Sequence, residues 1–204
     1  MAENLNDMNS MEFDVLKEIG NIGAGNATTA LSQMLNTKID MQVPTVRMLG
    51  FKELPEIIGG AENIVVGILL TLEGDIDGMM MFIMEKQPAH EISKLIMGGY
   101  ASEENDEFSE MELSALKEIG NIIAGAYLNS LSVLTKMTIS PSVPYLSIDM
   151  AGAILSVPAI EFSLMGDNAL LIETQFGEQD KMNGYFILTP TVDSYSKILK
   201  SLGL

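Results

Sequence analysis

A polar triple with steps of four and then three residues occurs twice in this sequence. Its two copies are Asp14–Glu18–Asn21 and Ser114–Glu118–Asn121. On an α-helix these steps place all three side chains on one face, within about 60° of arc. An Asn amide can hold and orient a water molecule, and a Glu carboxylate can accept a proton or pair with a cation. This set suits the positioning of water for attack on a group that is already electrophilic, such as an acyl phosphate.

Glycines lie within the same helical segments, at Gly20, Gly23, Gly25, Gly120 and Gly125. Each costs about 0.5–1 kcal/mol relative to Ala in a helix interior. Two explanations are open: close packing against another element of this protein, or close approach of a partner's backbone. A phosphate-binding loop is disfavoured, because such glycine motifs follow a strand and this segment lies in mid-helix without a Walker lysine.

An internal repeat spans nearly the whole chain, over residues 7–98 and 107–204 approximately. The letters LKEIGNI occupy residues 16–22 and again 116–122, and Val-Pro recurs at 43–44 and 143–144. Further along, Phe-Ile-Met at 82–84 resembles Phe-Ile-Leu at 186–188. Each half is predicted to contain a long helix, extended segments and a short closing helix.

The predicted long helices cover about residues 7–35 and 109–135, and Ser109 with Glu112 forms a capping-box signature. Strands are predicted at 38–49, 63–72, 77–84, 137–147, 161–174 and 183–189, with short helices beginning near Pro88 and Pro190. Short turns between consecutive strands indicate antiparallel pairing. The expected fold is therefore α+β: a single pseudo-twofold domain over residues 1–204, formed by internal duplication, with two long helices packed on a mainly antiparallel sheet.

The composition narrows the function classes. The net charge is −17, which argues against nucleic acid and anionic membrane surfaces as partners. The absence of Cys excludes thiolate catalysis and zinc–thiolate sites. Neither a secretory signal nor an apolar stretch long enough to span a bilayer is found, so we expect a cytoplasmic protein without membrane insertion.

The polar triple is followed by a proline 23 positions after its Asn, at Pro44 (44 − 21) and at Pro144 (144 − 121). This pattern resembles the signature of the CheC/CheX/FliY phosphatases of bacterial and archaeal chemotaxis. The resemblance covers the whole chain and includes two complete motifs, with Asp14, Ser114 and the two prolines as supporting positions. It implies hydrolysis of the aspartyl-phosphate of the response regulator CheY.

The same resemblance implies roles for the motif residues. Asn21 and Asn121 would align the attacking water, and Glu18 and Glu118 would hold the regulator by its active-site lysine. The Mg²⁺ would be carried by the regulator, so no metal or other cofactor is expected on this chain. The alternative function is a non-catalytic adaptor that sequesters CheY or CheD. The retained Asn in both copies favours the enzyme, because a docking helix has no need of that amide.

The resemblance also implies a second partner, the receptor deamidase CheD, which this chain would bind and regulate. The apolar, small-residue segment 148–155 follows Pro144 and has a poor match in the first half. It is a candidate docking helix, and an ordinary core segment is the alternative. The candidate contact residues are Asp149, Ala151, Gly152 and Ile154.

Two further residue types have simple interpretations. His90, the single histidine, is predicted to be a surface residue near a helix start. The run Met79-Met80-Met81 is predicted to fill the core of a strand rather than to form an adaptable binding surface.

Overall fold

The computed structural model describes residues 10–35, 38, 41–98, 107–162, 168–176 and 182–203. Its elements, in chain order, are α1 Ser10–Leu35, β1 Met41–Gly50, α2 Leu54–Ile57, β2 Ile64–Gly74, β3 Gly78–Glu85, α3 Lys86–Ile96, α4 Glu110–Thr135, β4 Ile139–Pro141, β5 Tyr145–Met150, α5 Ala151–Phe162, β6 Asn168–Phe176, β7 Met182–Pro190 and α6 Val192–Ser201. None of the helices within these ranges is long and apolar enough to cross a membrane.

The strands of both halves form one antiparallel sheet. Its order is β1-β6-β7-β3-β2-β4, and β5 pairs with β2 beside β4. The strands that follow each long helix pair with the opposite half. In the first half β1 lies against β6, and in the second half β4 and β5 both lie against β2. This exchange ties the two halves together at both edges of the sheet.

The pseudo-twofold axis passes between β3 and β7, where equivalent strands of the two halves meet. Phe82 lies opposite Phe186 in the antiparallel register, with ring centroids 6.4 Å apart. Outward from this pair, Met81 is opposite Ile187 and Ile83 is opposite Tyr185. The two phenylalanines are also equivalent in the sequence repeat, so the pseudo-twofold axis of the sheet relates the same residues that the repeat relates. The predicted α+β fold and its duplication are confirmed.

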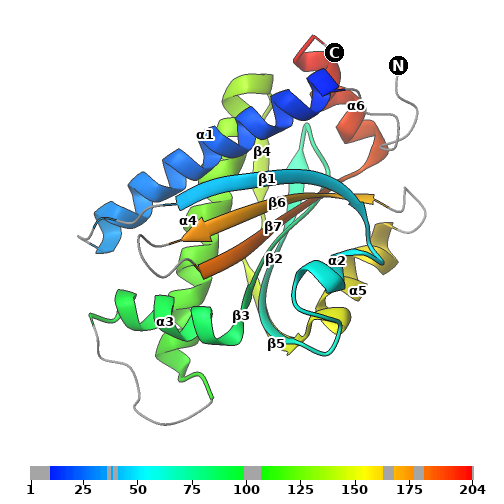
Figure 1. Cartoon of the computed structure of the whole chain (residues 1–204). Helices are drawn as coiled ribbons and strands as arrows, with labels where there is room; N and C mark the ends of the chain where they lie inside the picture. The colour runs from blue at the N-terminus through cyan, green and yellow to red at the C-terminus, as the bar shows by residue number, and fades with distance from the viewer. Residues whose placement is uncertain are drawn as a thin grey trace.

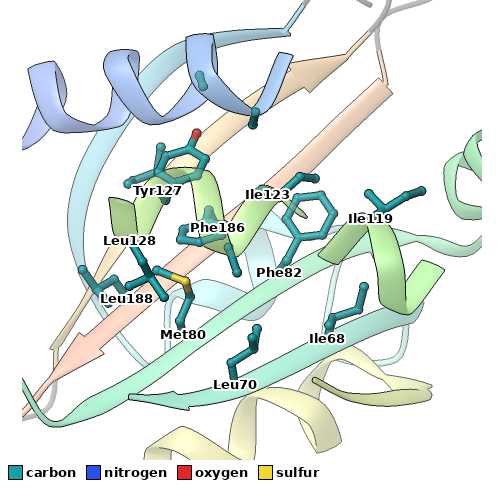
Figure 2. Packing of buried hydrophobic residues seen from close by; sticks show 14 of the residues in the cluster. Ile68, Leu70, Met80, Phe82, Ile119, Ile123, Tyr127, Leu128, Phe186 and Leu188 are labelled. Carbon is teal, nitrogen blue, oxygen red and sulfur yellow. The ribbon is translucent and has the colours of Figure 1, made fainter. Parts of the chain in front are cut away.

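The sheet is buried on both faces, and its strands alternate between two separate clusters. Met80, Phe82 and Met84 of β3 enter the first cluster, and Met81 and Ile83 enter the second. This period of two follows from the pleat of a strand. Figure 2 shows the first cluster, in which Ile119, Ile123 and Tyr127 of α4 lie over the sheet residues around Phe82. The prediction that the methionine run fills a strand core is confirmed for Met80 and Met81, which are buried.

The helices cover the two faces unequally. The long helices α1 and α4 cross each other over one face, with α3 and α6 at its margins, and α2 and α5 cover the other face (Figure 1). On that other face Ile154 of α5 packs against β2, where a Cβ on Gly67 would lie 2.8 Å from its side chain. A larger residue at position 67 would push α5 away from the sheet.

Several predicted elements differ from those observed. The strand predicted at 137–147 is two strands, β4 and β5, separated by residues 142–144. The strand predicted at 161–174 begins only at Asn168, because α5 continues to Phe162. Pro190 ends β7, so the closing helix starts after it, with the Thr191 hydroxyl accepting from the Ser194 N–H. Helix α2 was not predicted, and residues 7–9 of the first predicted helix lie outside the described ranges.

Candidate functional site

The second copy of the polar triple lies on a helix with a well-defined start. The Ser109 hydroxyl accepts a hydrogen bond from the backbone N–H of Glu112, and the Glu112 carboxylate accepts one from the backbone N–H of Ser109. This reciprocal pair is the predicted capping box, and it satisfies two of the N–H groups that a helix start leaves without partners. It fixes the register from which Ser114, Glu118 and Asn121 follow.

The two copies of the triple have the same environment. Every position from 14 to 25 has the same exposure class, buried, half-buried or exposed, as its counterpart one hundred residues later. The six side chains of the triples, Asp14, Glu18, Asn21, Ser114, Glu118 and Asn121, are all exposed. Within the described ranges these side chains make no hydrogen bond or ion pair with the rest of the chain. They are therefore available to a partner.

The triples lie apart from each other, one on each arm of the helix crossing. Helix α1 contacts α4 through Gly23 against Tyr127, and the Asn26 amide donates to the Ser130 hydroxyl at 3.1 Å. Both contacts are C-terminal to the motif asparagines, so the crossing lies beyond each triple (Figure 1). The chain thus carries two separate copies of one surface rather than a single composite site.

The structure divides four of the glycines of these helices into two groups, and the fifth, Gly20, is buried. A Cβ on Gly23 would lie 2.6 Å from the Tyr127 ring, and one on Gly120 would lie 2.7 Å from the Ile68 side chain. These two positions are explained by packing inside the protein. By contrast, a Cβ on Gly25 or Gly125 would meet nothing within 4 Å, and both residues are exposed. Internal packing does not account for this second pair.

The motif prolines lie at breaks in the edge strands. Pro44 lies in β1 where the register with β6 shifts between Gln42 and Thr45, and Pro144 immediately precedes β5. Proline has no N–H and therefore cannot continue a strand ladder. The position of these prolines identifies them as features of the exchanged strands, and they carry no group able to take part in proton transfer.

The candidate deamidase-binding residues divide between the surface and the core. Ala151 and Ile154 are buried in the second core cluster, and Gly152 is half-buried, with its N–H donating to the Ala61 carbonyl at 2.9 Å. Asp149 is exposed at the end of β5. Helix α5 begins inside this segment, at Ala151, but two of the four nominated side chains, those of Ala151 and Ile154, face the interior.

The prediction that His90 is a surface residue is wrong, because only 18% of its side chain is exposed. It is part-buried, its Nδ1 lies 3.2 Å from Oε1 of Glu112, and its ring stacks on Phe108 with centroids 3.7 Å apart. Burial would raise the pKa of Glu112, but hydrogen bonds from the Ser109 N–H and hydroxyl, with a smaller effect of His90, outweigh it and lower the pKa to about 2. The arrangement anchors α3 to the start of α4, and it lies in the framework of the second helix rather than in its exposed polar strip.

No group of three or more His, Asp or Glu side chains in the described part of the chain is placed to hold a metal ion. The surface that the structure offers for chemistry is the exposed strip of carboxylate and amide groups on each long helix.

The chain resembles known proteins over the segments that carry the two triples. The sequence model of the CheC-like family matches residues 11–48 and 111–148, which contain both triples and both motif prolines. The chain is 39% identical over 202 residues to the CheY-P phosphatase CheC of Bacillus subtilis, covering 97% of each. It is 30% identical over 139 residues to the flagellar motor switch phosphatase FliY of the same organism, covering 67% of this chain and 36% of that protein.

The fold has a counterpart among crystal structures. Thermotoga maritima FliY superimposes with a TM-score of 0.77 at 27% identity, covering 97% of this chain and 98% of that one. The duplicated exposed triple, the strands exchanged between the two halves and 39% identity along almost the full length therefore agree, and the chain belongs to the CheC-like family.

Proposed function

We propose that this chain hydrolyses the aspartyl-phosphate of the chemotaxis response regulator CheY at two sites. The observation that carries the proposal is the pair of exposed Glu–Asn strips, Glu18 with Asn21 and Glu118 with Asn121, whose side chains have no internal partner in the described ranges. The relative with 39% identity is named a CheY-P phosphatase, which supports the same activity here.

The geometry suits hydrolysis of an acyl phosphate. An Asn amide on a rigid helix can hydrogen-bond a water molecule and hold it in line with phosphorus, while the neighbouring Glu carboxylate pairs with a cation of the regulator. The water oxygen bonds to phosphorus as the bond from phosphorus to the aspartate oxygen breaks. The regulator's carboxylate is released, and the water's protons remain with the inorganic phosphate. The charge on the phosphoryl oxygens would be neutralised by Mg²⁺ that we expect the regulator to carry.

A non-catalytic adaptor is the competing function. Such a protein needs a surface that binds CheY or CheD, but it does not need a carboxamide at one fixed place beside a carboxylate. The exposed Asn21 and Asn121 are not used to stabilise the fold, because neither bonds within the described chain. Their presence on both helices favours hydrolysis over sequestration.

The decisive experiment is release of inorganic phosphate from phosphorylated CheY by the Asn21→Ala/Asn121→Ala variant. Loss of two water-positioning groups is expected to lower the rate by about 10²–10³-fold. Asn129→Ala, an exposed Asn on the same helix as Asn121, serves as the matched control and should retain the rate. Near-normal phosphate release by the double variant would exclude this mechanism, and binding of phosphorylated CheY without any release by the native chain would support the adaptor.

We further propose that CheD binds at the exposed end of β5 and the outer side of α5. Asp149 is exposed there, and Val157 and Ile160 leave 40% and 71% of their surface accessible on α5. Helices α2 and α5 lie on the opposite face of the sheet from α1 and α4 (Figure 1), so this partner would not occupy the Glu–Asn strips. The family resemblance supports CheD as the partner, and the exposure of Asp149, Val157 and Ile160 supports this surface as its binding site.

Titration calorimetry with CheD tests this second proposal. Asp149→Lys and Ile160→Ser should each weaken CheD binding while phosphate release from CheY is retained. Glu91→Lys, an exposed acid on α3 and away from β5 and α5, controls for the change of charge. Unchanged CheD affinity in both Asp149→Lys and Ile160→Ser would exclude this surface.

A further inference from the structure

Gly25 and Gly125 are exposed glycines inside long helices, and the fold does not require them. Neither has a positive φ, and a Cβ at either position would meet no atom within 4 Å. Glycine in a helix interior is less favourable than alanine, because it loses more conformational freedom on folding. The protein thus carries the same destabilising residue at the same place in both halves, where an alanine would fit its own structure.

The position of these glycines relative to the amides is specific. Gly25 follows Asn21 by four residues, and Gly125 follows Asn121 by four, so each lies one turn further along the same exposed face. Side chains of an α-helix lean toward its N-terminus and cover the preceding turn. A side chain at position 25 or 125 would therefore lie over the surface beside the motif amide.

The helix surface at these two positions is exposed, and within the described ranges no side chain of another element covers it. At Gly25 the carbonyl oxygen accepts a hydrogen bond at 2.9 Å from the Thr29 hydroxyl, one turn further along the same helix. By contrast, the backbone at Gly23 is covered by Tyr127 and that at Gly120 by Ile68. At Gly25 and Gly125 the helix backbone beside the motif amide is therefore not covered by a side chain, and a partner can reach it.

We propose that Gly25 and Gly125 are specificity-determining positions that keep the space beside the Asn21 and Asn121 amides open for the backbone of the phosphorylated regulator. The inference rests on the proposed function and deepens it. The absence of a side chain lets the loop that carries the acyl phosphate come within contact distance of the helix, so that the amide and its water reach phosphorus. A methyl group at this place holds the regulator away from the helix.

The test is the Gly25→Ala/Gly125→Ala variant, measured for stability and for activity. The thermal midpoint is expected to rise by about 2–4 °C per substitution, because alanine is the better helix former. The kcat/KM for phosphorylated CheY is expected to fall by about tenfold or more, since small displacements of a reacting group are costly. The affinity for beryllofluoride-activated CheY should fall in parallel, and Gly25→Leu/Gly125→Leu should lose more of both.

Two outcomes would overturn the inference. A raised midpoint with unchanged kcat/KM and unchanged affinity would show that no partner approaches these positions. A lowered midpoint accompanying the loss of activity would show that the glycines serve the fold. The opposite movement of stability and activity is the result that a merely structural role cannot produce.

Single-site backgrounds test whether each glycine acts on its own site. With Asn121→Ala present, the remaining activity comes from the first site, and Gly25→Ala should lower it about tenfold. Gly125→Ala in that same background should cause a substantially smaller loss, and equal losses would overturn the local role. If Asn21→Ala/Asn121→Ala retains activity, the proposed function fails. If that variant is inactive while the glycine variant keeps its activity and affinity, only this inference fails.

Discussion

The ring of Tyr127 on α4 occupies the space that a side chain at position 23 of α1 would need. A Cβ on Gly23 would lie 2.6 Å from Cδ1 of Tyr127, and the ring also stacks on Phe186 with centroids 4.4 Å apart. The residue equivalent to Gly23 in the other half is the larger Ile123, and the residue equivalent to Tyr127 is the smaller Ala27. Both Ile123 and Ala27 are buried. The duplicated halves have thus diverged by a complementary exchange of volume at the helix crossing.

The first prediction concerns this contact. Gly23→Ala is expected to destabilise the protein by about 1–3 kcal/mol, because an added methyl group overpacks a filled interior. Equilibrium denaturation in urea measures the change. Tyr127→Leu alone should also destabilise, but the double variant Gly23→Ala/Tyr127→Leu should be more stable than the sum of the two losses predicts. Strict additivity of the two single losses would contradict the contact.

The second prediction concerns the dependence of the protein's stability on pH in the acidic range. The pKa of Glu112 is lowered from its ordinary value of 4.5 to about 2 in the folded chain. Because the folded value is depressed, the ionised carboxylate stabilises the protein above pH 4.5, and this contribution is lost as the pH falls from 4.5 toward 2. Glu112→Gln should therefore be less stable near neutral pH, and its stability should change less over that acidic range.

Thermal midpoints across the acidic range, compared for the native chain and Glu112→Gln, check this expectation. Ser109→Ala removes the hydroxyl of the same capping box and should cost about 1 kcal/mol. Glu110→Gln, an exposed acid in the first turn of the same helix, is the control for loss of charge. If Glu112→Gln and Glu110→Gln flattened the pH profile equally, the buried network of Glu112 would not be the cause.

The placement of the candidate site's residues on exposed helix faces was predictable from sequence, because its signal is local. The spacing of Glu18 and Asn21 places them on one helix face whatever the rest of the fold, and the repeat at Glu118 and Asn121 shows that the pattern is not chance. The pairing of β1 with β6, and of β4 and β5 with β2, across the two halves was not predictable, since partner choice in a sheet is set by contacts distant in sequence. Likewise, the contact of His90 with Glu112 joins two helices whose sequences carry no local sign that they lie together.

The elements that sequence analysis placed wrongly have physical explanations. Helix α5 is apolar on all sides and contains Pro158, so it shows neither helical periodicity nor a favourable composition. The strand expected at 137–147 is divided at residues 142–144, which include the motif proline Pro144, and proline has no N–H with which to continue the ladder. The roles of Gly25 and Gly23 were inseparable in sequence, because only the structure shows that Tyr127 covers one and nothing covers the other.

The third prediction separates the two functional groups of each strip. If the carboxylates hold the regulator and the amides orient water, Glu18→Gln/Glu118→Gln should raise KM by about tenfold or more, because a charge-assisted hydrogen bond is lost at each site. Its kcat should change less than that of Asn21→Ala/Asn121→Ala. Steady-state hydrolysis of phosphorylated CheY and the affinity for beryllofluoride-activated CheY measure the two effects.

A matched control is needed because the chain carries a net charge of −17, and removal of any two acids reduces its general repulsion of an anionic partner. Glu56→Gln/Glu62→Gln removes two exposed carboxylates outside the long helices and changes the net charge by the same amount. This control should leave KM unchanged or lower it, whereas the motif variant should raise it. If KM rose in both the motif Glu variant and this control, the effect would come from overall charge. If kcat fell equally in the motif Glu variant and the motif Asn variant, the two groups would act as one catalytic unit rather than in separate roles.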